Sequence, residues 1–166
     1  MGRTIRSYSK VDQANEMIKK LCEKYPEVFW SIQPEKITVM GIDNVERSDR
    51  AIERSKIWSA LRNVKGVEKA IFMENNIGIR YILEVFWADW NKWSDSLRLA
   101  VLTENLLEIT PEVEKKNRPD CNGFRLLFDA LGLQWKYDES DTTGSKIPNL
   151  LMTDVKFDLE LRPGLE

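Results

Sequence analysis

The chain has 166 residues, of which 42% are hydrophobic and 31% charged, so it has the length and apolar content of one ordinary folded domain. Its 25 basic and 27 acidic side chains give a net charge of −2, which argues against a general nucleic-acid-binding protein. The absence of histidine excludes Ser-His-Asp and Cys-His nucleophile systems and every zinc site built on imidazole. Two cysteines, Cys22 and Cys121, are too few for a four-thiolate zinc site.

The first part of the chain predicts a helix and then a strand. Residues 9–25 place apolar side chains at spacings of three and four, with Ser9 positioned as the N-cap and Pro26 as the stop. Residues 36–42 are rich in β-branched side chains, which favours a strand. No long apolar run follows the N-terminal arginines, so we expect a cytoplasmic protein with no membrane partner.

The middle of the chain is harder to assign. Residues 45–66 fit either a helix or a strand, and we favour a strand in the centre of this segment. Residues 70–73 and 79–87 predict two strands, because they flank the turn-like sequence Asn75-Asn76-Ile77-Gly78 and the second is rich in β-branched and aromatic side chains.

The last part of the chain predicts two more helices and a strand. Ser94 is placed to cap a helix over residues 95–109, and Gly132 to end one over residues 123–131. Residues 152–161 alternate apolar and polar side chains as a half-exposed strand does. We therefore expect a single α+β domain over residues 1–166, with a small, mostly antiparallel sheet packed on helices.

The predicted helix over residues 95–109 is apolar on nearly every side, which is typical of a central helix. Glu104 and Glu108 lie one turn apart on it, so we expect both carboxylates to be partly enclosed and to repel each other. A basic partner, a shared proton or a hard cation would compensate them, and we favour an ion-pair network. The candidate basic partners are Arg98, Lys115, Lys116, Arg118 and Arg125.

A predicted strand and two predicted helices follow one another in the middle of the chain. Their sequences are IRYILEVFWADWNKW, SDSLRLAVLTENLLEI and NRPDCNGFRLLFDALGLQW. Their order, spacing and aromatic placement over residues 36–136 resemble the phage metallopeptidase family, minimal zinc proteases related to the gluzincins. In that family a strand leads into a helix that carries H-E-x-x-H, and a second helix brings the third zinc ligand. The resemblance implies a metalloprotease-like core of the zincin or SprT-like type.

The chain departs from that family at the catalytic motif itself. Aligning the motif places Glu104 and Glu108 at the two ligand histidines and Asn105 at the catalytic glutamate, while the third ligand falls beside Asp120. An amide does not titrate near neutral pH, so Asn105 cannot act as a general base. We therefore expect no catalytic residue, no metal and no cofactor, with the fold kept and the peptidase chemistry lost. The alternative is a metal-dependent hydrolase whose Glu104, Glu108 and Asp120 bind Mg²⁺, Ca²⁺ or Mn²⁺.

The resemblance implies a phage protein that acts in the host cytoplasm by binding a macromolecule, most simply another protein. An inhibitor of a bacterial defence protein, such as a CRISPR effector, fits that reading. We predict two contact surfaces: the regularly spaced Trp87, Trp90 and Trp93, and the acidic residues Asp138, Glu139 and Asp141 of a loop over residues 138–148, which could imitate phosphates. A weaker alternative is nucleic-acid binding through Arg47, Arg50, Arg54, Lys56, Arg62 and Lys65.

Overall fold

The computed structural model describes residues 6–43, 57–112, 116–119 and 123–163, and its centre is a four-stranded sheet. The strands lie in the order β1 (Ser7–Lys10), β2 (Ile37–Asp43), β4 (Tyr81–Phe86) and β3 (Ser59–Asn63). The two central strands, β2 and β4, run parallel, whereas each outer strand is antiparallel to its neighbour. The sheet is therefore mixed, and the predicted α+β class is confirmed.

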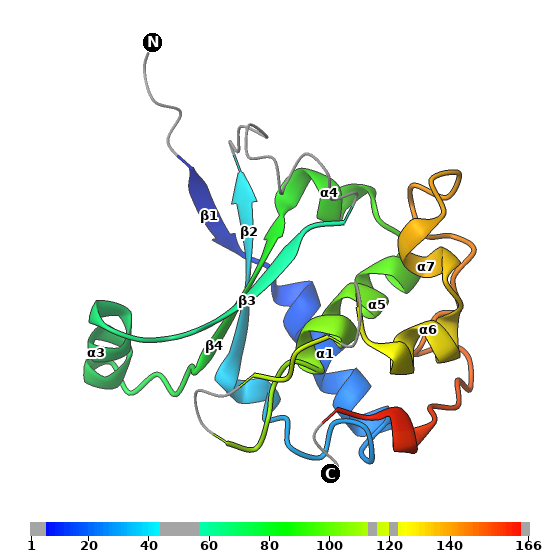
Figure 1. Ribbon diagram of the computed structural model, residues 1–166. Helices are drawn as coiled ribbons and strands as arrows, with labels where there is room; N and C mark the ends of the chain where they lie inside the picture. The colour runs from blue at the N-terminus through cyan, green and yellow to red at the C-terminus, as the bar shows by residue number, and fades with distance from the viewer. Residues whose placement is uncertain (1–5, 44–56, 113–115, 120–122, 164–166) are drawn as a thin grey trace.

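The helices are distributed unequally around the sheet (Figure 1). Helices α1 (Asp12–Lys24) and α5 (Asp95–Leu106) lie side by side against one face of the sheet, and α6 (Arg125–Leu131) and α7 (Gln134–Tyr137) lie beyond α5. Helix α4 (Trp87–Lys92) follows β4 directly. Helix α3 (Val67–Glu74) stands apart from the other helices, at the far end of the β3–β4 ladder. Two single turns of 3-10 helix, η1 (Pro34–Lys36) and η2 (Leu159–Leu161), complete the described elements.

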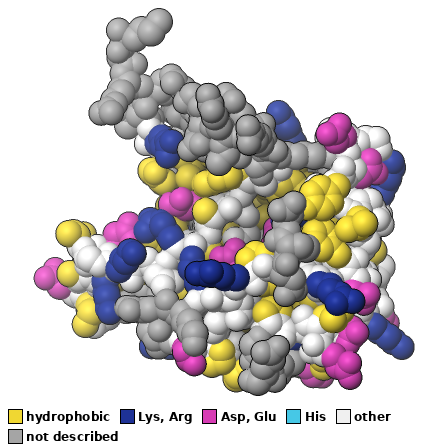
Figure 2. Space-filling view, viewed as in Figure 1, with side chains coloured by type: hydrophobic (Ala, Val, Ile, Leu, Met, Phe, Trp, Pro, Cys, Tyr) yellow, Lys and Arg dark blue, Asp and Glu magenta, His cyan; other side chains and the backbone are white. Residues whose placement is uncertain are grey.

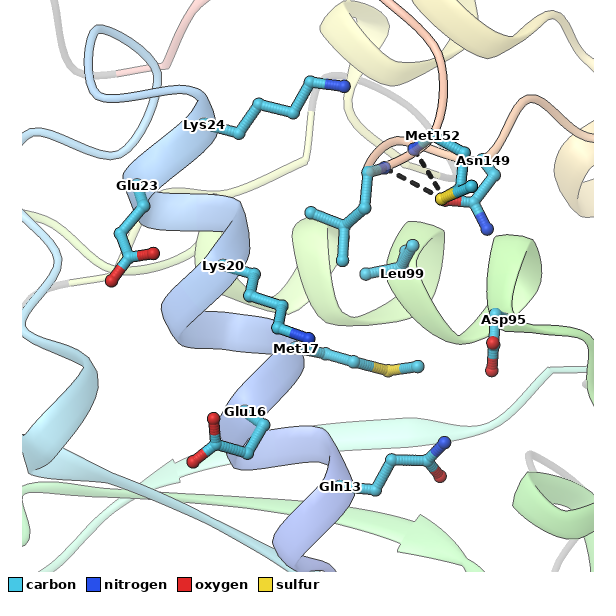
Figure 3. A pocket seen from close by; sticks show the side chains of 11 residues that line it. Gln13, Glu16, Met17, Lys20, Glu23, Lys24, Asp95, Leu99, Asn149 and Met152 are labelled. Atoms are coloured by element: carbon cyan, nitrogen blue, oxygen red, sulfur yellow. Dashed lines mark hydrogen bonds between the residues drawn. The ribbon is translucent and has the colours of Figure 1, made fainter.

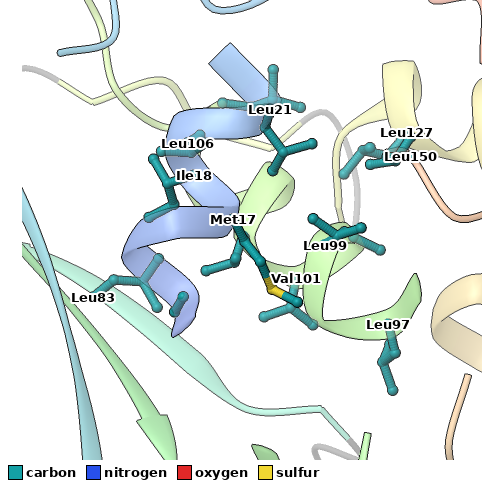
Figure 4. Close-up of a cluster of buried hydrophobic side chains, with 14 of the residues drawn as sticks. Met17, Ile18, Leu21, Leu83, Leu97, Leu99, Val101, Leu106, Leu127 and Leu150 are labelled. Atoms are coloured by element: carbon teal, nitrogen blue, oxygen red, sulfur yellow. The ribbon is translucent and has the colours of Figure 1, made fainter. Parts of the chain in front are cut away.

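Helix α5 lies in the middle of the hydrophobic core, as its apolar pattern predicts (Figure 4). Eight of its twelve residues are buried, which leaves very little of the helix for solvent. The predicted cap is also confirmed, because Ser94 Oγ accepts a hydrogen bond from the Leu97 amide at 3.3 Å. The core that surrounds α5 includes Ile18 and Leu21 of α1 and Leu83 of β4. This placement means that any polar side chain on α5 needs a partner inside the protein.

Several predicted elements are confirmed with small changes at their ends. The strand predicted over residues 36–42 is β2. Within residues 45–66 the structure has a strand, β3, near the end of the segment, while residues 44–56 lie outside the described part of the chain. The predicted turn after α3 is present, with Asn76 at a φ of 54°. Gly132 ends α6 at a φ of 81°, a conformation that glycine adopts without strain.

Two predicted strands are wrong. The segment over residues 70–73 belongs to helix α3, which is rich in the strong helix formers Glu, Lys, Ala and Met. The segment over residues 152–161 forms no strand and ends in η2, and three of its apolar side chains, Val155, Phe157 and Leu161, pack singly on the core. Phe157, for example, meets the Tyr25 ring edge-on at 5.1 Å between centroids.

The predicted cap at Ser9 is also wrong. Ser9 pairs with Gly41 in the β1–β2 ladder, and α1 begins only after Val11, which offers no side-chain cap. Within the described ranges, none of the helices has both the length and the apolar composition that a bilayer crossing requires. The metalloprotease-like core stays a prediction, because the α+β class alone does not distinguish it.

Candidate functional site

The site most suggested by the sequence is the second half of α5, where Glu104 lies against helix α7. A carboxylate oxygen of Glu104 is 2.5 Å from Lys136 Nζ, and the two side chains are only 13% and 21% exposed. The neighbouring Gly123 leaves room for this carboxylate, because a Cβ on Gly123 would lie 3.0 Å from Glu104 Oε1. The ammonium of Lys136 also lies 5.6 Å from the centre of the Trp135 ring. Glu104 is therefore the acidic half of an enclosed ion pair between α5 and α7.

Glu108 has a basic partner of its own. Its carboxylate lies 4.0 Å from Lys116 Nζ, and the same ammonium donates a hydrogen bond to the Leu61 carbonyl of β3. Lys116 was among the expected partners, and the favoured ion-pair interpretation is confirmed for both glutamates. Lys136 was missed, because it follows Gly132 in a segment for which no helix was expected. Only the packing of α7 against α5 brings it to Glu104.

Burial controls the protonation of both glutamates. Burial raises the pKa of Glu104 above its usual value, although the charge and hydrogen bond of Lys136 act in the opposite direction. Burial also raises the pKa of Glu108, with Lys116 lowering it and the charge of Glu104 raising it further. The loss of hydration thus outweighs the attraction of the lysines at both carboxyl groups.

Asn105, the residue at the position of the catalytic glutamate, is buried and holds α5 to the sheet by hydrogen bonds. Its Nδ2 donates to Ser59 Oγ of β3 and to the Val101 carbonyl one turn earlier, both at 2.8 Å. Buried amides are normally satisfied in this way, since an unpaired one costs free energy. Asn105 therefore joins α5 to the sheet, and its two amide protons are already committed to hydrogen bonds.

Two of the three residues of the alternative metal site, Glu104 and Glu108, lie within the described part of the chain. Among the residues that the structure describes, no group of three or more acidic or cysteine side chains could hold a metal ion. Of the three candidate ligands, Glu104 and Glu108 are each engaged by a lysine, and Asp120 lies outside the described residues. The cation close to each described carboxylate is thus an ammonium group.

The three predicted contact tryptophans do not form an exposed cluster. Trp90 and Trp93 are buried in the core, with ring centroids 6.2 Å apart. Trp87 is half-buried and lies over Gly41 of β2, where a Cβ would come within 2.4 Å of its ring. The regular spacing of these tryptophans thus reflects packing at the junction of β4 and α4, so we correct their assignment as a binding surface.

The acidic loop uses two of its three carboxylates internally. Asp138 accepts hydrogen bonds from the Ser140 amide and hydroxyl, and Lys146 lies 3.6 Å away. These contacts, the hydroxyl of Ser140 foremost, lower the pKa of Asp138. Asp141 likewise accepts from the amides of Ser145 and Lys146. Glu139 alone projects into solvent without such a role in the loop, so this loop is a weak imitation of a phosphate backbone.

Only two of the six basic residues proposed to bind nucleic acid, Arg62 and Lys65, lie within the described part of the chain. Arg47, Arg50, Arg54 and Lys56 lie outside the described residues. Arg62 is divided between Glu68, at 2.7 Å, and Glu84, at 3.0 Å, so its charge is neutralised within the sheet and α3. Lys65 is exposed. The described members of the set therefore contribute one uncommitted charge.

A surface that sequence reasoning missed is the apolar face of α3. Its side chains include Val67, 76% exposed, and Met73, 68% exposed, with Ile71 and Ile77 about half-exposed nearby. Figure 2 shows hydrophobic side chains mixed with charged ones on the projection that carries α3. Treating residues 70–73 as a strand hid this feature, because a helix period would have placed Val67, Ala70 and Met73 at successive turns on one side.

A wide cavity of about 690 Å³ lies between α1, the start of α5 and residues 149–152 (Figure 3). Its lining is chemically mixed: Glu16, Glu23 and Asp95 stand beside Lys20 and Lys24, over an apolar floor. Lys24 is already committed, since it donates to the Thr153 carbonyl at 2.7 Å. This mixture of charges favours no single class of ligand.

The chain matches no family model, no curated protein and no solved structure. The resemblance to the phage metallopeptidase family therefore stays a prediction.

Proposed function

We propose that the chain is a non-catalytic protein on a metallopeptidase-like scaffold that acts by binding another protein. One observation carries this proposal: the carboxylate at the first ligand position of the motif, Glu104, is paired with Lys136 at 2.5 Å. A metal ion at that carboxylate would have to displace the ammonium group and stand beside its positive charge, which is electrostatically unfavourable.

The neighbouring positions support the same interpretation. A metal-dependent peptidase needs a group that takes a proton from the metal-bound water, and the amide of Asn105 cannot do so. Both amide protons of Asn105 are used to hold α5 against Ser59 and Val101. The residues at the motif therefore contribute to stability, and the activity must come from a surface of the protein.

The surface that best suits a protein partner is the exposed face of α3. It presents Val67 and Met73 to solvent, and the exposed basic residues Lys65 and Lys69 lie just before it and on it, with the exposed acid Glu74 at its end. The charge of Glu68 does not change this balance, because it is paired with Arg62. The complementary partner is a protein whose contact patch is apolar and has an acidic rim.

The resemblance supplies the setting of this proposal. A phage protein with this surface would act in the cytoplasm of its host, and a bacterial defence protein, such as a CRISPR effector, is the class of target that we favour. The competing function is a hydrolase with a carboxylate-bound metal at Glu104, Glu108 and Asp120. The metal content of the purified protein distinguishes the two.

The proposal is tested by capture of partners from a bacterial host lysate, followed by affinity measurement with the purified candidate. The variant is Val67→Ser with Met73→Ser, and the matched control is Leu133→Ser, which alters an exposed apolar residue elsewhere, 64% exposed. We expect the double variant to lose about tenfold or more in affinity while the control stays within about twofold of wild type. Equal affinities for all three proteins would contradict a role for α3.

A further inference from the structure

A small cavity of about 110 Å³ lies on the side of the sheet where η1, the start of β4 and the chain after α5 meet. Two cationic residues, Lys36 and Arg80, line it together with the neutral polar residues Ser31, Gln33, Tyr81 and Thr110. None of its lining residues is acidic. Because a water molecule occupies about 30 Å³ in the liquid, the cavity has room for a tetrahedral oxyanion with a little water.

We propose that this cavity is a binding site for a single phosphate group, carried by a small phosphate monoester. An arginine offers paired donors whose planar fork suits phosphate, and a lysine adds a compact positive charge. Among the described residues, Lys36 and Arg80 form no ion pair, in contrast to Arg62 on the neighbouring strand, whose charge is divided between Glu68 and Glu84. The hydroxyl groups of Ser31 and Tyr81 can add neutral donors.

None of the three acids that adjoin its lining residues in sequence, Glu35, Glu108 and Glu112, lines this cavity. The C-terminal end of α5 would repel an anion if its carbonyl groups were bare. Two carbonyl groups just past the end of α5 are occupied, because the Leu107 and Glu108 carbonyls both accept hydrogen bonds from Asn117, at 3.1 and 2.8 Å. Glu35, the acid next to Lys36 in sequence, lines a different cavity beside Cys22. This inference does not depend on the proposed function, since it uses neither α3 nor the motif positions of α5.

Titration with inorganic phosphate at constant ionic strength, followed by NMR shifts of the Arg80 and Tyr81 amides, tests the site. We expect saturable binding to wild type and a loss of about tenfold in affinity in Arg80→Gln and in Lys36→Gln. The matched control is Lys69→Gln, which removes the same charge from α3, and its affinity should stay within about twofold of wild type. Circular dichroism of each variant verifies that the fold is kept.

Two further ligands, glycerol phosphate and a short thymidine oligonucleotide, distinguish a small phosphate monoester from a nucleic-acid backbone as the source of the phosphate group. Tighter binding of glycerol phosphate supports a small monoester, whereas tighter binding of the oligonucleotide would overturn that assignment in favour of a nucleic-acid backbone. Shifts that never saturate, or an equal loss in Lys69→Gln and Arg80→Gln, would contradict a specific site.

Discussion

Glu104 on α5 and Lys136 on α7 form an ion pair with 2.5 Å between carboxylate oxygen and ammonium nitrogen. The pair connects a helix that ends well before Gly132 to one that begins just after it. The pair is enclosed, and the same carboxylate occupies the motif position that the family resemblance assigns to a zinc ligand. Its role in stability can therefore be separated from any role in metal binding.

Removing the ammonium group should destabilise the protein. In Lys136→Met the Glu104 carboxylate keeps its burial and loses its partner, so we expect the free energy of unfolding to fall by about 2 kcal/mol, less than for a fully enclosed pair. Urea unfolding measures this change. Lys69→Met, an exposed lysine on α3, should alter it by no more than about 0.5 kcal/mol. Most of the loss should be recovered in Glu104→Gln with Lys136→Met, and no recovery would argue against the pair.

The raised pKa values of Glu104 and Glu108 predict a distinct dependence of stability on pH. Between the ordinary value of 4.5 and the higher folded value, the folded state holds protons that the unfolded state has released. The contribution of these groups to the free energy of unfolding therefore rises as pH falls through that interval, and this rise is complete below pH 4.5.

The comparison that isolates this effect is wild type against Glu104→Gln with Lys136→Met, unfolded in urea at several pH values from neutral to mildly acidic. The double variant should have a shallower slope, because Glu104 no longer contributes and its charge no longer raises the pKa of Glu108. Glu68, whose pKa is lowered by Arg62, acts with the opposite sign but equally in both proteins, so it cancels. Identical slopes would show that the pKa of Glu104 is not raised by folding.

How far the sequence predicted the fold depended on how local each signal was. Ser94 and Gly132 act through their own backbone, so the ends of α5 and α6 could be predicted. The helix α3 was missed because its apolar residues suit either period over so few positions. Residues 152–161 alternate apolar and polar side chains like a strand, yet no strand of the described sheet pairs with them. Pairing depends on the tertiary structure and cannot be predicted from this local pattern.

In the candidate site, too, the features that depend on nearby residues could be predicted and the long-range contacts could not. Enclosure of Glu104 and Glu108 followed from the apolar character of their helix, and Lys116 was close enough in sequence to be a candidate partner. Lys136 could not be found, because 32 residues separate it from Glu104 and only the placement of α7 unites them. The burial of Trp90 likewise depends on the packing of α4, whereas the spacing of the tryptophans suits a buried or an exposed row.

The hydrogen bonds of Asn105 predict that it is a stabilising residue. Asn105→Ala removes the bonds to Ser59 and Val101, so we expect a loss of about 1–3 kcal/mol in the free energy of unfolding. Ser59→Ala should cost less, because the amide keeps its bond to the Val101 carbonyl. Chemical denaturation of both single variants and the double variant gives the coupling between them. Strictly additive effects would show that Asn105 and Ser59 do not interact.

The contact between Gly41 and Trp87 predicts a steric effect. In Gly41→Ala the new methyl group would meet the Trp87 ring at 2.4 Å, so we expect a cost of about 1–3 kcal/mol as the ring or strand shifts. Thermal unfolding should show a lower midpoint for this variant. In a Trp87→Ala background the same substitution should have a much smaller effect. An undiminished cost there would place the strain elsewhere in β2.

The central claim is that the carboxylates at the motif positions are paired with lysines, and that no metal chemistry takes place there. Elemental analysis of the purified full chain after mild dialysis tests it most directly, with Glu104→Gln plus Glu108→Gln as the comparison. We predict less than stoichiometric Mn, Ca and Mg in wild type, and no difference from the double variant. Stoichiometric metal in wild type that is lost in the double variant would contradict the claim and favour the hydrolase.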